Sequence, residues 1–279
     1  MIPKSNIAAL LFAAAVSLAC ADTGSAAPWA GLAQTRDDRT LQGDDEWCAT
    51  ADAEGFCEVR EFTLPADRGT IEVDASPNGG IRVESWDRDE ILVRAKVQAR
   101  TRDDSDAEAL AREVEILTSG TIRARGPRTG RRESWHVSYR LYVPRNSNLD
   151  LESVNGGIGI NEIAGDIRFR TTNGGVHLSG VSGDVRGSTT NGGLNIELAG
   201  ESWDGAGLDV ETVNGSVRVS VPEGYSAHLE SGTVNGSMRF DFPVTFQGPV
   251  RRRIEVDLGE GGQTLRAVTT NGSVVVSRA

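Results

Sequence analysis

The chain has few of the residues from which reactive sites are built. Its 279 residues include three His, three Cys and two Lys, and aromatic residues make up 5%. The histidines, His136, His177 and His228, are far apart in the sequence, and we expect each to lie at the surface. A metal centre or a catalytic triad needs two or more such groups that converge. We therefore expect no metal, no cofactor and no enzymatic activity.

Other functional signatures are also missing. The sequence has no GxSxG or SxxK nucleophile motif, no P-loop, and no GxGxxG between a strand and a helix. The net charge of −11 is unsuited to DNA or RNA, whose affinity for proteins rests mainly on cationic contacts. After residue 20 no apolar run approaches the ~18 residues that span a bilayer. These features argue against a nucleic-acid partner and against a downstream membrane span.

Residues 1–21 have the three parts of a secretory signal: a positive start at Lys4, a short apolar stretch and small residues before Asp22. The sequence allows two alternative processing sites. An Ala-x-Ala motif allows cleavage before Asp22, whereas residues 16–20 fit a relaxed lipoprotein box in which Cys20 becomes acylated. We favour the lipid anchor, because a lone cysteine at this position otherwise has no purpose. Both predict export to the periplasm, an outer-membrane anchor or the extracellular space.

The other two cysteines predict a disulfide. Cys48 and Cys57 close a short loop, and neither a CxxC spacing nor a nearby histidine suggests a metal or redox pair. Trp47 is expected to pack on this loop. Residues 22–46 are polar and without periodicity, which is typical of a flexible tether. The folded region is therefore expected at 47–279.

The first part of the folded region alternates apolar and polar residues at period two, which predicts successive strands. One helix is expected at about 105–114, capped by Asp104 or Ser105, because apolar residues recur there at helical spacing. A hairpin of strands 121–125 and 134–143 is expected to follow. The chain is therefore expected to be all-β with one small inserted helix.

An internal repeat occupies residues 151–279. Asn-Gly-Gly recurs three times at a period of 18 residues, and three looser Asn-Gly-Ser copies follow. The turn asparagines are Asn155, Asn173, Asn191, Asn214, Asn235 and Asn271. Aligned on the period, aliphatic residues fall into three columns: Ile158, Val176 and Leu194; Ile160, Leu178 and Ile196; Ile163, Val181 and Ala199. Each period holds two turn signals and so at least two short strands.

A fixed period with apolar residues in register is typical of a solenoid. Stacking coils at the strand spacing of ~4.8 Å puts each aliphatic side chain above its equivalent. The asparagines would stack likewise, and the glycine after each can take a positive φ without a Cβ clash. We therefore predict a right-handed β-solenoid. An antiparallel β-sandwich of Asn-Gly hairpins is the alternative, but hairpins alone do not demand an 18-residue period.

Two carboxylates in the repeat are candidates for chemistry. Asp166 and Asp184 would stack one coil apart, near Arg168, Arg170 and Arg186. Paired carboxylates can serve glycoside hydrolysis or bind Ca²⁺. Gly-Asp is also an ordinary turn pair, and the series ends after two members, so we favour the turn role. A polysaccharide-binding or carbohydrate-active protein remains the alternative function.

Several segments resemble one family. The phrase T-[TV]-N-G-[GS]-[VI]-x-[VL], the segment IRVESWDRDEI at 81–91 and the helix DAEAL at 106–110 are similar to the bacterial "putative adhesin" family. The resemblance covers about residues 58–279. It implies a strand-rich, β-helix-like repeat exposed on the cell envelope, and it carries over no catalytic residues.

From these observations we expect an exported, non-enzymatic scaffold or adhesin-like protein that presents a binding surface. Its partner would be a cell-surface polymer, a membrane protein or another envelope component. The membrane would be reached only through an N-terminal lipid anchor.

Overall fold

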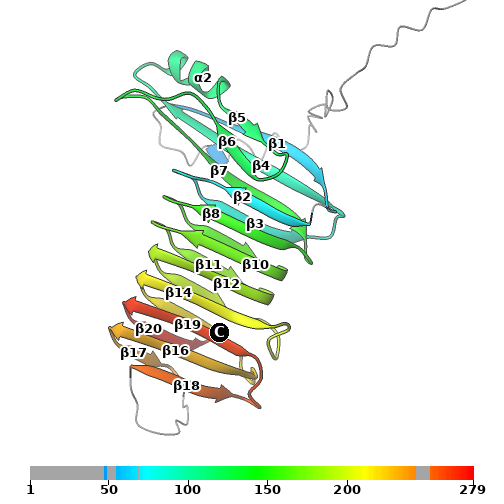
Figure 1. The fold of residues 1–279 in the computed structure, drawn as a ribbon, viewed down its shortest axis with the longest axis vertical. Helices are drawn as coiled ribbons and strands as arrows, with labels where there is room; N and C mark the ends of the chain where they lie inside the picture. Colours follow the sequence, from blue (N-terminus) through cyan, green and yellow to red (C-terminus); the bar gives the residue numbers. More distant parts are fainter. Residues whose placement is uncertain (1–46, 49–54, 68, 243–251) are drawn as a thin grey trace, which may run out of the picture. The chain divides into compact units, whose positions relative to one another are not determined.

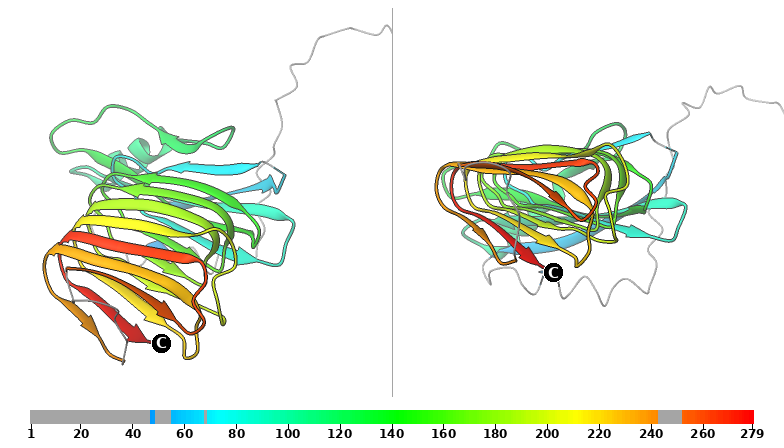
Figure 2. Two further views of the ribbon diagram at one scale, coloured as in Figure 1. Left: turned by 60° about the horizontal axis from the view of Figure 1, so that its bottom comes forward. Right: turned by 90° about the horizontal axis from the view of Figure 1, so that it is seen from below.

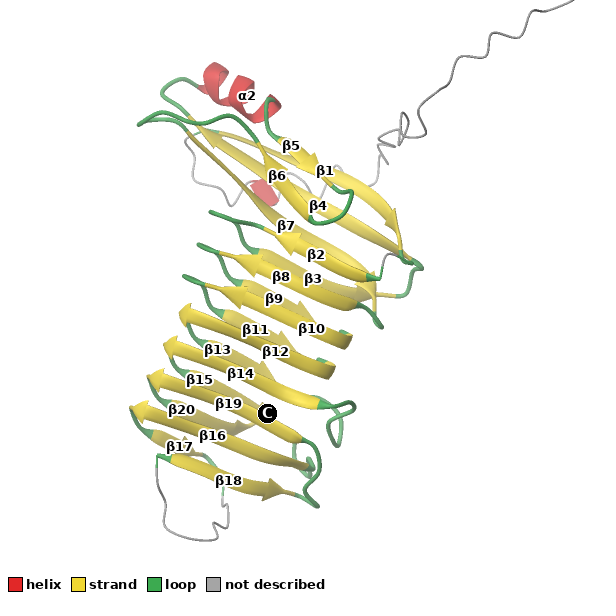
Figure 3. Ribbon diagram, in the orientation of Figure 1, coloured by secondary structure: helices red, strands yellow, loops and turns green. Residues whose placement is uncertain are grey.

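The computed structural model describes residues 47–48, 55–67, 69–242 and 252–279. The expected signal at 1–21, the tether at 22–46 and Cys20 lie outside the described residues. The chain divides into two compact units, 1–35 and 36–279, and every described residue belongs to the second. Its described residues form two ten-stranded sheets and the short helix α2 (Asp104–Arg112) (Figures 1 and 3).

Neighbouring strands in each sheet are joined by hydrogen bonds in one spatial order. Sheet A consists of β1 (Phe56–Pro65), β4 (Glu90–Arg100), β7 (Ser134–Pro144), β3 (Ile81–Trp86), β9 (Ile158–Asn161), β11 (Val176–Ser179), β13 (Leu194–Glu197), β15 (Val217–Val221), β20 (Val274–Arg278) and β17 (Met238–Phe240). Sheet B consists of β18 (Arg253–Leu258), β16 (Ala227–Asn235), β19 (Thr264–Asn271), β14 (Gly207–Asn214), β12 (Ser182–Asn191), β10 (Ala164–Thr171), β8 (Asn148–Ser153), β2 (Thr70–Asp74), β6 (Ile122–Arg125) and β5 (Glu115–Leu117).

The repeat forms a β-solenoid, because its strands pair in parallel and in register. Each turn of the chain gives one strand to sheet B and the next to sheet A, and Figure 2 shows these rungs stacked. Val176 lies opposite Ile158 on one side and Leu194 on the other, as the 18-residue period predicts. The antiparallel sandwich is therefore wrong for the repeat.

The core lies between the two sheets, where aliphatic side chains form columns across the rungs. One column of sheet B consists of Ile71, Leu149, Ile167, Val185, Leu208, Leu265 and Leu229, all buried. The first two predicted columns of sheet A are also buried. The third is wrong at its last member: Ala199 is exposed and its neighbour Leu198 is buried.

The rungs do not stack in sequence order at the C-terminal end. Strand β19 lies between β14 and β16, and β20 lies between β15 and β17. The rung that is last in the chain is thus inserted before the rung formed by β16 and β17. Strand β18 pairs antiparallel with β16 and ends sheet B. The irregular spacing of the late Asn-Gly copies reflects this return of the chain.

The N-terminal end of the stack is covered by elements outside the repeat. Strands β1, β4 and β7 extend sheet A; they pair antiparallel with one another, and β7 pairs parallel with β3. Strands β5 and β6 extend sheet B, where β6 pairs parallel with β2. The expected hairpin of 121–125 and 134–143 is wrong, because β6 and β7 lie in different sheets. The helix, α2 (Asp104–Arg112), starts and ends earlier than expected, and its N-cap is Asp103, which makes no side-chain capping bond.

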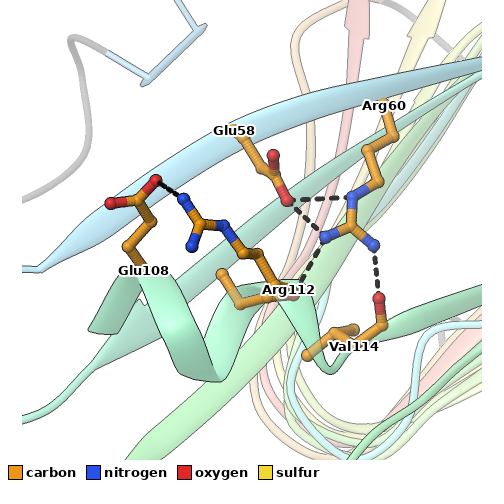
Figure 4. Close-up of polar contacts among 6 residues, drawn as sticks. Glu58, Arg60, Glu108, Arg112 and Val114 are labelled. Atoms are coloured by element: carbon orange, nitrogen blue, oxygen red, sulfur yellow. Dashed lines mark hydrogen bonds and ion pairs between the residues drawn. The ribbon is translucent and has the colours of Figure 1, made fainter. Parts of the chain in front are cut away.

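Arg60 of β1 fixes the end of α2 to sheet A (Figure 4). Its guanidinium donates to the carbonyl oxygens of Ala111, at 2.9 Å, and of Val114. The same group pairs with Glu58, and Arg112 pairs with Glu108 within the helix. The Ala111 carbonyl also accepts from the backbone N–H of Val114 at 3.0 Å, and Val114 lies just beyond the helix end. Arg60 thus adds side-chain donors to the turn that follows the helix. No helix among the described residues is long and apolar enough to cross a bilayer.

The column packing predicts a sharp contrast between neighbours on β11. Leu178 is fully buried, whereas the side chain of His177 is 41% exposed. Leu178→Ala should lower the free energy of unfolding by about 2–5 kcal/mol, because it leaves a cavity in a packed column. His177→Ala should change it by about 0.5 kcal/mol or less. Urea denaturation followed by circular dichroism measures both, and equal losses would contradict the packing described.

Candidate functional site

The repeat asparagines form a ladder along one corner of the stack. Each side-chain amide donates from Nδ2 to the Oδ1 of the asparagine on the preceding rung, at 2.8–2.9 Å. In spatial order the ladder runs Asn78, Asn155, Asn173, Asn191, Asn214, Asn271 and Asn235. An amide carries a donor and an acceptor on opposite sides, so identical amides stacked at the strand spacing can bond in an unbroken row.

Asn78 is the ladder member that sequence reasoning missed. It belongs to the rung of β2 and β3, which pairs directly with β8 and β9. The phrase Pro77-Asn78-Gly79-Gly80 carries the same Asn-Gly-Gly signal as the repeat. The separation of 77 positions between Asn78 and Asn155 conceals the match, since strands β4 to β7 and the helix intervene.

The glycine after each asparagine is needed for close approach and not for its φ angle. Gly156, Gly174 and Gly192 do not have positive φ, so the expected reason is wrong. A Cβ on Gly174 would lie 2.0 Å from the carbonyl oxygen of Gly156, and one on Gly192 would lie 2.0 Å from that of Gly174. The backbones of successive rungs therefore meet at this turn too closely for any side chain.

A row of buried hydroxyl groups lies behind the ladder. The hydroxyl of Thr171 donates to the carbonyl of Gly156 at 2.9 Å, and that of Thr189 to Gly174 at 2.8 Å. The other rungs repeat this bond with Ser153, Thr212, Thr269 and Thr233. Buried hydroxyls and carbonyls are costly without partners, so these bonds let polar turns close over an apolar core.

The two candidate carboxylates lie opposite each other, as the period predicts. Asp166 on β10 is the register partner of Asp184 on β12. Each pairs with the arginine two residues further along its own strand: Asp166 Oδ2 is 3.0 Å from Arg168 Nη2, and Asp184 Oδ2 is 2.9 Å from Arg186 Nη2. Each carboxylate thus has its own cation, which argues against a shared acid–base site. The expected turn role is wrong, because both residues lie within strands.

The outward face of sheet B carries a continuous line of charge, here called the charged row. It occupies one register position on six neighbouring strands: Asp150, Arg168, Arg186, Asp209, Arg266 and Glu230. Three of these six residues are arginines and three are acidic, and Arg266 also pairs with Asp209 directly. The same register position is occupied by Glu72 on β2 and by Glu255 on β18. In-register pairing therefore builds a surface of fixed charges spaced by one strand.

The histidines do not come together. His177 Nε2 lies 3.9 Å from Glu197 Oε1, and His228 Nδ1 lies 2.6 Å from Asp257 Oδ1. His136, expected at the surface, is half-buried on β7 and bonds to Gln98 at 3.1 Å. Across the described part of the chain, no three His, Cys, Asp or Glu side chains are grouped so that they could hold a metal ion.

A disulfide joins Cys48 to Cys57 at the start of β1. Beside it, the indole ring of Trp47 lies against a group of cations on the outward face of sheet A. The ring centroid is 4.8 Å from Arg140 Cζ, 5.2 Å from Lys96 Nζ and 5.9 Å from Arg94 Cζ. Cations are attracted to the face of an indole, so Trp47 packs against these three charged side chains.

The chain is similar to one protein family and to several solved structures. Residues 145–277 match the family described as Toastrack DUF4097. No curated protein matches the chain. A "putative cell adhesion protein" from Clostridium sporogenes is 8% identical with a TM-score of 0.42, covering 80% of this chain and 100% of that one. A "putative adhesin" from Bacteroides fragilis is 9% identical with a TM-score of 0.35, covering 80% and 97%. A "putative lipid binding protein" from Parabacteroides distasonis is 11% identical with a TM-score of 0.33, covering 82% and 98%.

The close approach of the rungs predicts opposite outcomes at two adjacent glycines. A Cβ on Gly174 would meet a backbone oxygen at 2.0 Å, whereas one on Gly175 would lie 3.5 Å from its nearest backbone atom. Gly174→Ala should lower the free energy of unfolding by about 1–3 kcal/mol, because the rungs must move apart. Gly175→Ala should cost less than about 1 kcal/mol. Thermal and urea denaturation compare them, and an equal effect would show that the turns do not touch.

Proposed function

Residues 145–277 match the DUF4097 toastrack family. From this premise we propose that the chain is an exported, non-enzymatic protein, which presents a rigid binding surface to the cell envelope. The observation that carries the proposal is the charged row. It gives the outward face of sheet B a periodic pattern of charge that an extended polymer of the envelope can match.

Export is supported by two independent features. The first 21 residues have the composition of a secretory signal, with Cys20 placed for lipid attachment. The second feature is the disulfide between Cys48 and Cys57. Disulfides persist in oxidising compartments and are rare in the cytosol, so this bond fits a protein that leaves the cytoplasm.

Rigidity is supported by the way the charged row is held. Arg168 and Arg186 project from strands whose opposite faces lie in the buried columns, and each strand pairs with two neighbours. The asparagine ladder ties the corner of every rung to the next. Since binding then costs little ordering of the surface, the affinity depends mainly on charge and shape.

Binding by the charged row predicts a loss of affinity when its cations are removed. Purified protein should sediment with isolated bacterial envelopes, and Arg168→Gln with Arg186→Gln should weaken this binding at least tenfold. The matched control is Arg218→Gln, which removes an exposed cation from β15 on the other sheet. Binding should weaken as salt is raised, because the contacts are exposed charges.

The same preparation tests export. When the full chain is expressed in a bacterial host, mass spectrometry should find a mature protein that starts at acylated Cys20 or at Asp22, with Cys48 and Cys57 oxidised. An intact Met1 in the cytoplasm, or envelope binding that the double variant and the control leave equally strong, would refute the proposal.

A further inference from the structure

A cavity of about 540 Å³ opens on the outward face of sheet A, beside the first rung of the asparagine ladder. Its walls are the turn at 78–80 and the strands β4 and β7. Register places Lys96 opposite Ser138 and Gln98 opposite His136, so four polar side chains from two strands share the floor. This cavity is remote from the charged row, which lies on sheet B.

The cavity is cationic in a chain whose net charge is −11. Lys96, Arg100 and His136 line it. Burial lowers the pKa of Lys96, and the charge of Arg140 lowers it further. Burial also lowers the pKa of His136, followed by the charges of Lys96 and Arg100. The charges of Lys96 and Arg100 therefore act on the same partly desolvated space and disfavour the charged form of His136.

Carboxylates on the neighbouring strands are engaged elsewhere and do not neutralise Lys96. In the described parts of β1, β3, β4 and β7, three outward acidic side chains occur, and each pairs with an arginine that does not line the cavity. The pairs are Glu61 with Arg94 at 2.6 Å, Glu84 with Arg82 at 3.8 Å, and Glu90 with Arg88 at 3.4 Å.

Neutral donors converge on the same space. Every amide of the ladder donates toward the N-terminal end, so Asn78 accepts from Asn155 and its own Nδ2 is the terminal donor of the row. The Oε1 of Gln98 accepts from His136 Nε2, which leaves the Gln98 amide nitrogen to donate. The hydroxyl of Ser138 accepts from the Gly80 N–H and keeps its own proton to donate. Amides aligned head to tail also add a partial positive charge at the donor end.

We propose that this cavity binds an oxyanion, the carboxylate or phosphate group of an acidic ligand. The ammonium of Lys96 supplies the charge, and Asn78, Gln98 and Ser138 supply hydrogen bonds to its oxygens. Charge-assisted hydrogen bonds of this type are the stronger ones, and a half-buried lysine gains most from them where the described carboxylates on neighbouring strands are paired elsewhere. The site is separate from the charged row, so oxyanion binding can be tested independently of the proposed function.

The test uses the full mature chain and the imidazole NMR signals of its three histidines. Inorganic phosphate and, in a second arm, acetate are titrated at fixed pH and at an ionic strength held constant with chloride. The signals of His136 should shift and saturate, while those of His177 and His228 stay in place. Saturation by phosphate alone assigns a phosphate ligand, by acetate alone a carboxylate ligand, and by both a general oxyanion site.

Two variants and two matched controls assign the binding to the cavity. Lys96→Gln should weaken binding at least tenfold, whereas Arg218→Gln on β15, a strand that does not line the cavity, should leave it unchanged. Asn78→Ala, which removes the donor end of the ladder, should weaken binding several-fold, whereas Asn235→Ala removes the acceptor end and should not. Circular dichroism and the Cys48–Cys57 disulfide confirm that each variant is folded.

The proposal fails on any of three results. The first is no saturable shift of His136 with either anion. The second is a parallel shift of all three histidines, which is an effect of ionic conditions only. The third is equal binding by the folded Lys96→Gln and Asn78→Ala variants and the unchanged chain.

Discussion

Parallel, in-register pairing of one rung with the next is the constraint on which the rest of this structure depends. It places every residue of a rung beside its equivalent, so a single sequence preference is repeated along the whole stack. An aliphatic position becomes a buried column, an asparagine position becomes a ladder, and a charged position becomes the charged row. A slip of one residue would turn each column toward solvent, so the columns and the ladder fix the same register.

The ladder also gives the stack two unlike ends. Its amides all donate in one direction, toward Asn78, and accept in the other, toward Asn235. Both ends of a solenoid expose unpaired strand edges and core side chains unless other elements cover them. At the N-terminal end the cover is the antiparallel extension and α2, held by Arg60. The donor end of the ladder therefore opens beside β4 and β7, which bring the cations of the oxyanion cavity.

The sequence predicts what recurs at a fixed period and misses what the chain brings together from a distance. The columns around Val176 and Leu178 follow from 18-residue spacing, and so does the pairing of Asp166 with Asp184. The period does not predict that the chain returns to insert β19 between β14 and β16, because the spatial order of the rungs depends on tertiary packing. The sequence predicts a glycine at 174 for its φ angle, whereas the structure requires it because the backbones of two rungs approach closely there. The sequence of a single rung does not show this approach.

The candidate sites divide in the same way. The six repeat asparagines are readable from their Asn-Gly turns, and the disulfide partners follow from cysteine count and spacing. The oxyanion cavity combines Asn78, Lys96 and His136, which belong to three separate strands or turns, and no motif links the three. Arg60 likewise lies in a strand, and no local sequence signal indicates that it bonds to the end of a helix 51 residues away. Such groupings arise only when the antiparallel strands fold onto the first rung.

Engineered cross-linking tests the order and register of the rungs most directly. Asp209 lies directly opposite Arg266, whereas β19 separates it from Glu230. A disulfide needs Cα atoms within about 7 Å, which neighbouring strands about 4.8 Å apart satisfy and strands two apart do not. Mild oxidation of Asp209→Cys with Arg266→Cys should give an intramolecular disulfide by peptide mapping, and Asp209→Cys with Glu230→Cys should not. Cross-linking of the second pair and not of the first would contradict the stacked arrangement.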